Sequence, residues 1–261
     1  MEKLKQLVCA RIDEQAQEVI ALVKSIESEA ELGYKEQKTA AKIASFFAKQ
    51  GLPYQTGLAL TGVKASIGAG DINVAILGAL DAVLCADSPK ADPNTGAAHA
   101  CGHAVQLGAL LAVATAFNEG IMQELAGRIT FMAVPAEEYV EIAYRNALRE
   151  QGKIKYLGGK QELIRLGEFD DVDMAMMIHS EKNQPANSVS IGKSSNGFIG
   201  KTIQYIGETS HAAESPDLGV NALNAAMLGL MGIHAMRETF RDADAIRVHP
   251  IITKGGDLVN S

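Results

Sequence analysis

Residues 96–104 read Gly-Ala-Ala-His-Ala-Cys-Gly-His-Ala, and the fold of the chain can be worked out from this segment. It carries Cys101 and His103, two side chains of metal-ligand type, two positions apart. An apolar run with helical spacing follows at once, which predicts that the pair stands at the start of a buried helix over residues 103–118. Ordinary core packing does not require His99 beside this pair, so the segment indicates a functional site.

Three short apolar runs predict buried strands of an α/β sheet, and a polar residue follows each run. The runs are residues 73–80, 128–134 and 173–178, and the residues that follow them are Asp81, Glu137 with Glu138, and His179. Alternating helices and strands predict a mostly parallel sheet with helices on both faces. In such sheets, sites form beyond the carboxyl ends of the strands. We therefore expect these polar residues to meet the Cys-Gly-His segment at one edge.

The remaining pattern predicts two domains, at 1–194 and 195–261. Apolar spacing predicts helices over residues 2–30, 36–50 and 220–240, and alternation predicts strands over residues 63–67, 200–206 and 245–253. The first of these strands has the pattern of an exposed edge. The second domain thus begins as strand, helix and strand and ends on a turn.

Composition narrows the class of protein. The 261 residues carry a formal net charge of -7, which argues against nucleic acid or an anionic membrane as a partner. The sequence shows no secretory signal and no apolar run of about 20 residues that could span a bilayer. Three cysteines, Cys9, Cys85 and Cys101, fit a reducing, cytoplasmic setting with free or metal-bound thiols.

Thiolate, imidazole and carboxylate are the ligands that zinc-like ions take. Two adjacent Glu residues at a strand end point in different directions, so one can bind a metal while the other acts as a general base. Each residue also has a structural interpretation. Cys101 can be a small buried hydrophobe, His103 a hydrogen-bonding residue at a helix start, the Glu pair a solvated helix start, and His179 a strand-end histidine. A nucleophilic Cys101 with a histidine base is the chemical alternative.

Four motifs resemble the M20 metallopeptidases, and in particular their amidohydrolase subfamily of aminoacylases and aminobenzoyl-glutamate hydrolases. The motifs are Ala98-His-Ala-Cys-Gly-His103, Val134-Pro-Ala-Glu-Glu138, Met177-Ile-His179 and Gly207-Glu-Thr-Ser-His-Ala-Ala213. They occur in the order of the family. The resemblance implies a two-metal α/β catalytic domain, followed by an α+β, ferredoxin-like lid domain through which the protein forms a homodimer.

The resemblance also implies roles for single residues. The metal ligands would be Cys101, His103, Glu138 and His179, with Cys101 as the bridge between two divalent ions, which would be Zn²⁺, or alternatively Mn²⁺ or Co²⁺. Glu137 would activate the bridging water, and His211 would stabilise the oxyanion in a partner subunit. Asp81 would orient a ligand, and Asn260 would contact the substrate, an N-acyl or N-aroyl amino acid or a short peptide.

The chain departs from the family pattern in two ways. Ala104 stands where the family has Asp or Asn after Cys-Gly-His. The family also continues past residue 261, through the rest of the lid to one more His ligand. The resemblance therefore implies an incomplete lid and an incomplete enzyme, with weak metal binding and little activity unless the rest is supplied. An inactive binding or dimerising protein of this fold, or a thiol hydrolase using Cys101, are the alternatives.

Overall fold

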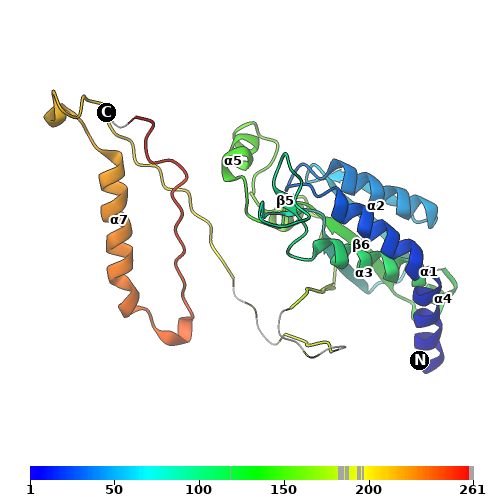
Figure 1. Ribbon diagram of the computed structural model, residues 1–261. Coiled ribbons are helices and arrows are strands. Elements are labelled where there is room, and N and C mark those ends of the chain that lie inside the picture. Colours follow the sequence, from blue (N-terminus) through cyan, green and yellow to red (C-terminus); the bar gives the residue numbers. More distant parts are fainter. Residues whose placement is uncertain (118, 182–184, 186–187, 193–194, 196, 259–261) are drawn as a thin grey trace. The chain divides into compact units, whose positions relative to one another are not determined.

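The computed structural model describes the chain except for residues 118, 182–184, 186–187, 193–194, 196 and 259–261. The chain forms two compact units, Met1–Ser188 and Val189–Ser261 (Figure 1). The domains predicted at 1–194 and 195–261 stay a prediction, because a compact unit is not by itself an independently folding domain.

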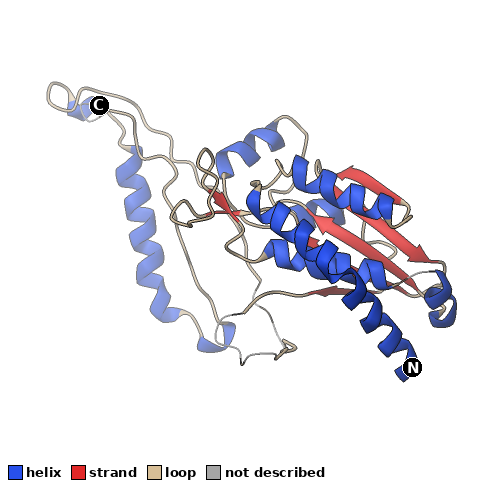
Figure 2. Ribbon diagram, turned by 45° about the vertical axis from the view of Figure 1, so that its right-hand side comes forward, coloured by secondary structure: helices blue, strands red, loops and turns tan. Residues whose placement is uncertain are grey.

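The first unit combines helices with a β-sheet (Figure 2). Its helices are α1 (Glu2–Ser28), α2 (Gln37–Lys49), α3 (His103–Ala116), α4 (Glu119–Leu125), α5 (Ile142–Glu150) and α6 (Gly159–Arg165). Its strands are β1 (Tyr54–Leu58), β2 (Gly62–Gly68), β3 (Asn73–Ala79), β4 (Val83–Leu84), β5 (Ala97–Ala98), β6 (Arg128–Val134) and β7 (Met174–Met177). The predicted α/β class is confirmed.

The main sheet has the strand order β1-β2-β6-β3-β7. Strand β3 pairs in parallel with both β6 and β7, whereas β2 pairs antiparallel with β6 and with β1. The parallel part therefore consists of the three strands that were predicted from their apolar runs. Their carboxyl ends lie at one edge, because parallel neighbours point the same way. This edge carries the candidate site.

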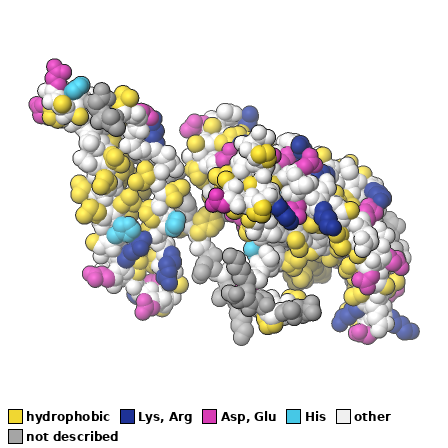
Figure 3. Space-filling view, viewed as in Figure 1, with side chains coloured by type: hydrophobic (Ala, Val, Ile, Leu, Met, Phe, Trp, Pro, Cys, Tyr) yellow, Lys and Arg dark blue, Asp and Glu magenta, His cyan; other side chains and the backbone are white. Residues whose placement is uncertain are grey.

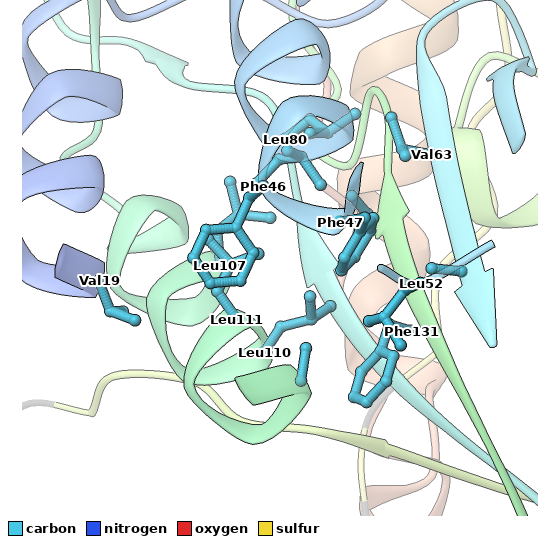
Figure 4. Close-up of a cluster of buried hydrophobic side chains, with 14 of the residues drawn as sticks. Val19, Phe46, Phe47, Leu52, Val63, Leu80, Leu107, Leu110, Leu111 and Phe131 are labelled. Atoms are coloured by element: carbon cyan, nitrogen blue, oxygen red, sulfur yellow. The ribbon is translucent and has the colours of Figure 1, made fainter. Parts of the chain in front are cut away.

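Side chains alternate between the two faces of the sheet, as the strand period of two requires. On one face, Phe131 of β6 packs with Phe47 of α2 and Leu110 of α3 in the larger apolar core (Figure 4). On the other face, Met132 of β6 packs with Leu148 of α5. The predicted cover of helices on both faces is thus confirmed, and it fixes the strand ends between two packed layers.

The edges of the sheet differ from the sequence prediction. Residues 63–67 lie in β2, which is paired on both sides and mostly buried, so the predicted exposed edge is wrong. The edge strand is β1, whose pattern Tyr-Gln-Thr-Gly-Leu is too polar to predict a strand. At the other edge, all four residues of β7 are exposed, although the apolar run at 173–178 predicted burial. Burial depends on a neighbour in space, and β7 pairs only with β3 among the described residues.

The second unit contains one long helix, α7 (Ala222–Met236), with three short 3₁₀ turns, Pro216–Leu218, Arg237–Thr239 and Asp242–Asp244. Apolar side chains cover α7 (Figure 3), including Leu223, Met227 and Met231. The helix predicted at 220–240 is confirmed. The strands predicted at 200–206 and 245–253 are wrong for the described residues, where the unit has only the bridge between Glu208 and Val220. An alternating segment becomes a strand only when a partner completes its hydrogen bonds.

Within the described part of the chain, we find no helix with the length and apolar character needed to span a membrane.

Candidate metal centre

The strand ends bring the predicted acidic residues next to the start of α3. Asp81 follows β3, is fully buried, and accepts a hydrogen bond on Oδ2 from the backbone N–H of Glu138, at 2.9 Å. Its backbone oxygen lies 2.8 Å from Nδ1 of His103. Asp81 therefore connects the turn after β6 with the first residue of α3.

The Cys-Gly-His segment turns sharply at its glycine. Gly102 has a φ of 88°, in the left-handed region that glycine adopts at least cost. A Cβ at this position would lie 2.5 Å from Oγ of Ser180, which itself donates a hydrogen bond to the backbone oxygen of Cys101. The turn at Gly102 brings the side chains of Cys101 and His103 close to each other.

Two groups of potential ligands result. One consists of Cys101, His103 and His179, and the other of His103, Glu137 and Glu138. Within each group, the possible ligand atoms all lie within 4.8 Å of one another. Ligand atoms that share one ion lie at most about 4.6 Å apart, because each bond is about 2.0–2.3 Å long. The residues are therefore close to the spacing that an ion of this kind requires.

The hydrogen bonds of the two imidazoles identify the nitrogen that each can offer. A backbone oxygen only accepts, so Nδ1 of His103 donates to Asp81 and Nδ1 of His179 donates to Ser180, at 2.8 Å in both cases. Each neutral ring then carries its lone pair on Nε2. Nε2 of His179 lies 3.4 Å from Sγ of Cys101. The backbone thus holds both rings in the tautomer that binds a metal.

The test of fit is the environment of Nε2 in His103. This atom is buried and has no hydrogen-bond partner among the described residues. Its nearest carboxylate oxygens are Oε2 of Glu137 at 3.7 Å and Oε1 of Glu138 at 3.9 Å. A buried lone pair that faces two carboxylates is unfavourable unless a proton or a cation lies between them. The donor set therefore fits a divalent cation.

The pKa values of Cys101 and His103 are both raised. Burial raises the pKa of Cys101 to about 12, and a hydrogen bond with Glu138 and the charge of Glu137 add to the shift. A thiol with this pKa is a poor nucleophile at neutral pH, which argues against the thiol hydrolase. Burial alone would lower the pKa of His103, but the hydrogen bond and charge of Asp81 outweigh it and raise the pKa. A proton and a cation thus compete for the same nitrogen.

Sequence reasoning missed Lys160 and Gln106. Nζ of Lys160 lies 3.0 Å from Oε1 of Glu137. Gln106 of α3 is buried, accepts a hydrogen bond from the backbone N–H of Ala79, and donates one to the backbone oxygen of Ile178. It connects the ends of β3 and β7 directly before His179. Neither residue belongs to a motif, and only its position in space reveals its contacts.

Three further candidate residues from the sequence are His99, His211 and Asn260. His99 is half-buried, its two ring nitrogens are buried without a hydrogen-bond partner among the described residues, and burial lowers its pKa to about 4. His211 lies in the second unit, where Nδ1 accepts hydrogen bonds from the backbone N–H groups of Ala213 and Glu214. Its role at the oxyanion stays a prediction. Asn260 lies outside the described residues.

Over residues 75–250, the chain matches the family model for Peptidase family M20/M25/M40. Xaa-Arg dipeptidase of Mus musculus is 30% identical to it, over 98% of this chain and 55% of that protein. One of the p-aminobenzoyl-glutamate hydrolase subunits of Escherichia coli is 30% identical, over 74% of this chain and 37% of that protein. The chain spans about half the length, or less, of these curated relatives.

A solved structure shows the same fold. It belongs to a Bacillus subtilis protein that is called a dinuclear metal-binding peptidase from the M20 family. The TM-score is 0.51 at 22% identity, over 65% of this chain and 44% of that chain. The family match includes the segments that carry Cys101, Glu137, His179 and His211.

Proposed function

This chain belongs to peptidase family M20/M25/M40, and from that premise we propose that its first unit carries most of the active site of a metal-dependent hydrolase. The reaction is cleavage of the amide bond of an N-acyl or N-aroyl amino acid or a short peptide. One observation carries the proposal: buried Nε2 of His103 faces Glu137 and Glu138 without a hydrogen-bond partner, beside the 3.4 Å contact between Cys101 and His179.

The side chains of Cys101, His103, Glu138 and His179 would hold two divalent ions. Their thiolate favours Zn²⁺, while carboxylate ligands also suit Mn²⁺ or Co²⁺. Two divalent ions in such a site would polarise the scissile carbonyl and lower the pKa of the attacking water. The hydrogen bonds that His103 and His179 donate to the backbone oxygens of Asp81 and Ser180 keep the two imidazoles oriented for binding.

Glu137 is the proposed general base, and its contact with Lys160 supports this division of roles. Oε1 of Glu138 lies 3.9 Å from Nε2 of His103, which puts it among the possible ligands. Lys160 holds Oε1 of Glu137 at 3.0 Å, and this leaves Oε2 to accept the proton of the attacking water. Because Lys160 and Glu137 are both partly exposed, their ion pair restrains the carboxylate more than it stabilises the fold.

The second unit supplies the remaining proposed roles. Nδ1 of His211 accepts hydrogen bonds, so its neutral ring carries a proton on Nε2. That N–H is the kind of donor that stabilises an oxyanion. We extend the proposal to Asn260 as a substrate contact, to a homodimer formed through residues 195–261, and to a cytoplasmic setting. The dipeptidase and the aminobenzoyl-glutamate hydrolase support small acyl-amino-acid or dipeptide substrates.

Glu137→Gln in the full protein tests the proposal. The assay measures hydrolysis of p-aminobenzoyl-glutamate, N-acetyl amino acids and dipeptides that end in arginine, after metal removal and after addition of Zn²⁺, Mn²⁺ or Co²⁺. We expect turnover only with metal, and a loss of about 10²- to 10⁴-fold in the variant with unchanged metal content. Glu150→Gln, at the exposed end of α5, is the control and should retain full activity.

Two outcomes would contradict the proposal. Activity that survives chelation and disappears on alkylation of the thiol would assign the reaction to Cys101. A protein that neither binds metal nor hydrolyses any of these substrates would be a non-catalytic member of the family.

A further inference from the structure

The turn that carries Glu137 and Glu138 has a backbone that needs support. It begins at Ala136, which has a φ of 50° although it is not a glycine. Such a conformation persists when the surrounding structure determines it from several sides. The question is what holds this turn, because its conformation decides where the two carboxylates point.

Two fully buried ionisable side chains hold the backbone of the turn. Oε1 of Glu36 accepts a hydrogen bond from the N–H of Ala136 at 2.7 Å, and Oε2 accepts one from Oγ1 of Thr61 at 2.6 Å. Nη1 of Arg145 donates to the oxygen of Ala136 at 3.3 Å, and Nη2 donates to the oxygen of Glu138. Each end of the turn is therefore held by a charged or polar group.

The two side chains come from segments far apart in the sequence. Glu36 precedes α2, and Arg145 lies on α5. The packing around the turn is tight at Gly33. A Cβ at this position would lie 2.8 Å from Cα of Ala136 and closer still to Nη2 of Arg145. The contact is thus built into the core of the unit.

The partners of Arg145 are unusual for a buried guanidinium. It donates to three backbone oxygens, the third being Leu157 at 2.8 Å, and lies 5.5 Å from the centre of the Tyr34 ring. No carboxylate of the described residues forms an ion pair with it. A buried charge without a counter-charge costs free energy, so a contribution to stability does not explain Arg145. Its planar fork, however, can fix several carbonyl directions at once.

We propose that Arg145 and Glu36 are positioning residues, which lock the Ala136 turn so that Glu138 reaches the ligand group while Glu137 stays free to act as the base. This inference rests on the proposed function. If either contact is lost, the peptide of Ala136 can rotate, and both carboxylates move relative to Nε2 of His103.

The test is Co²⁺ binding by the full protein, measured by calorimetric titration and by the visible absorption spectrum of bound Co²⁺. Arg145→Met removes the fork, and Arg145→Lys keeps the charge but satisfies fewer carbonyls. We expect Co²⁺ affinity to fall by about 10- to 100-fold in the first variant and less in the second, with an altered spectrum in both. Glu36→Gln keeps the acceptor for Ala136 and should bind Co²⁺ as the wild type does.

Two controls on the same helix separate positioning from general destabilisation. Leu148→Ala removes a buried side chain from the apolar cluster that also contains Ala136 but leaves the hydrogen bonds of the turn in place, and Arg149→Met removes an exposed charge. Both should keep the wild-type affinity and spectrum, even if Leu148→Ala unfolds at a lower temperature than the wild type.

Other results would overturn either the positioning role alone or the proposed function as well. Wild-type binding in both Arg145 variants, or an equal loss in Leu148→Ala, would overturn the positioning role and leave the proposed function intact. If Arg145→Met does not fold, Arg145→Lys and Glu36→Ala take its place, and normal Co²⁺ binding in both would overturn the role. A wild-type protein that binds no Co²⁺ would overturn the proposed function, and the positioning role with it.

Discussion

Replacing Glu36 by Gln should change how the stability of the protein depends on pH. Burial, with a smaller effect of the charge of Asp81, raises the pKa of Glu36 to about 7 from its ordinary value of 4.5. Between these values the folded state binds more protons at this group than the unfolded state, so stability is lost as the pH rises. The shift is about 2.5 units, and each unit is worth about 1.4 kcal/mol, which gives about 3 kcal/mol.

Urea unfolding followed by circular dichroism, in chelator and between about pH 4.5 and 7.5, measures this effect. Gln does not titrate, so the free energy of unfolding of Glu36→Gln should rise relative to the wild type by about 3 kcal/mol across the range. His99 titrates in the same window with the opposite sign, because burial lowers its pKa to about 4, but it contributes to both proteins alike. A difference in the free energy of unfolding that stays constant, or that falls as the pH rises, would show that folding does not raise the pKa of Glu36.

Two further substitutions test the framework of the site. Gly102→Ala should weaken metal binding in a calorimetric titration, because φ is 88° and the new Cβ would lie 2.5 Å from Oγ of Ser180; unchanged affinity would show that the turn adapts. Gln106→Leu leaves the buried N–H of Ala79 without its acceptor and should cost about 1–3 kcal/mol in urea unfolding. Val105→Ala, at an exposed position of the same helix, should cost much less, and an equal loss would contradict the role of Gln106.

The sequence predicted the parts of the fold that repeat with a period. The apolar runs of β3 and β6 and the helix after Cys101 are found where they were predicted, and the family resemblance of four short motifs is confirmed. These features are local, because each follows from the spacing of apolar side chains or from the chemistry of adjacent residues.

The sequence predictions that were wrong concern strand pairing and burial, which depend on neighbouring residues in space. Among the described residues, β7 has a strand neighbour on one side only, and the segments at 200–206 and 245–253 pair with no strand, which no local pattern can report. Glu36 and Arg145 are fully buried although their residue types are usually exposed. The sequence offered no signal for them, since their partners are backbone groups of a turn about 100 and 10 residues away.

X-ray absorption at the metal edge of the Zn²⁺-loaded protein shows whether Cys101 and His179 bind the metal. We expect a sulfur neighbour at about 2.3 Å from zinc, lost in Cys101→Ser and kept in Cys85→Ser, together with imidazole scattering that weakens in His179→Ala. A spectrum without sulfur in the wild type, or with sulfur that persists in Cys101→Ser, would contradict metal binding by Cys101.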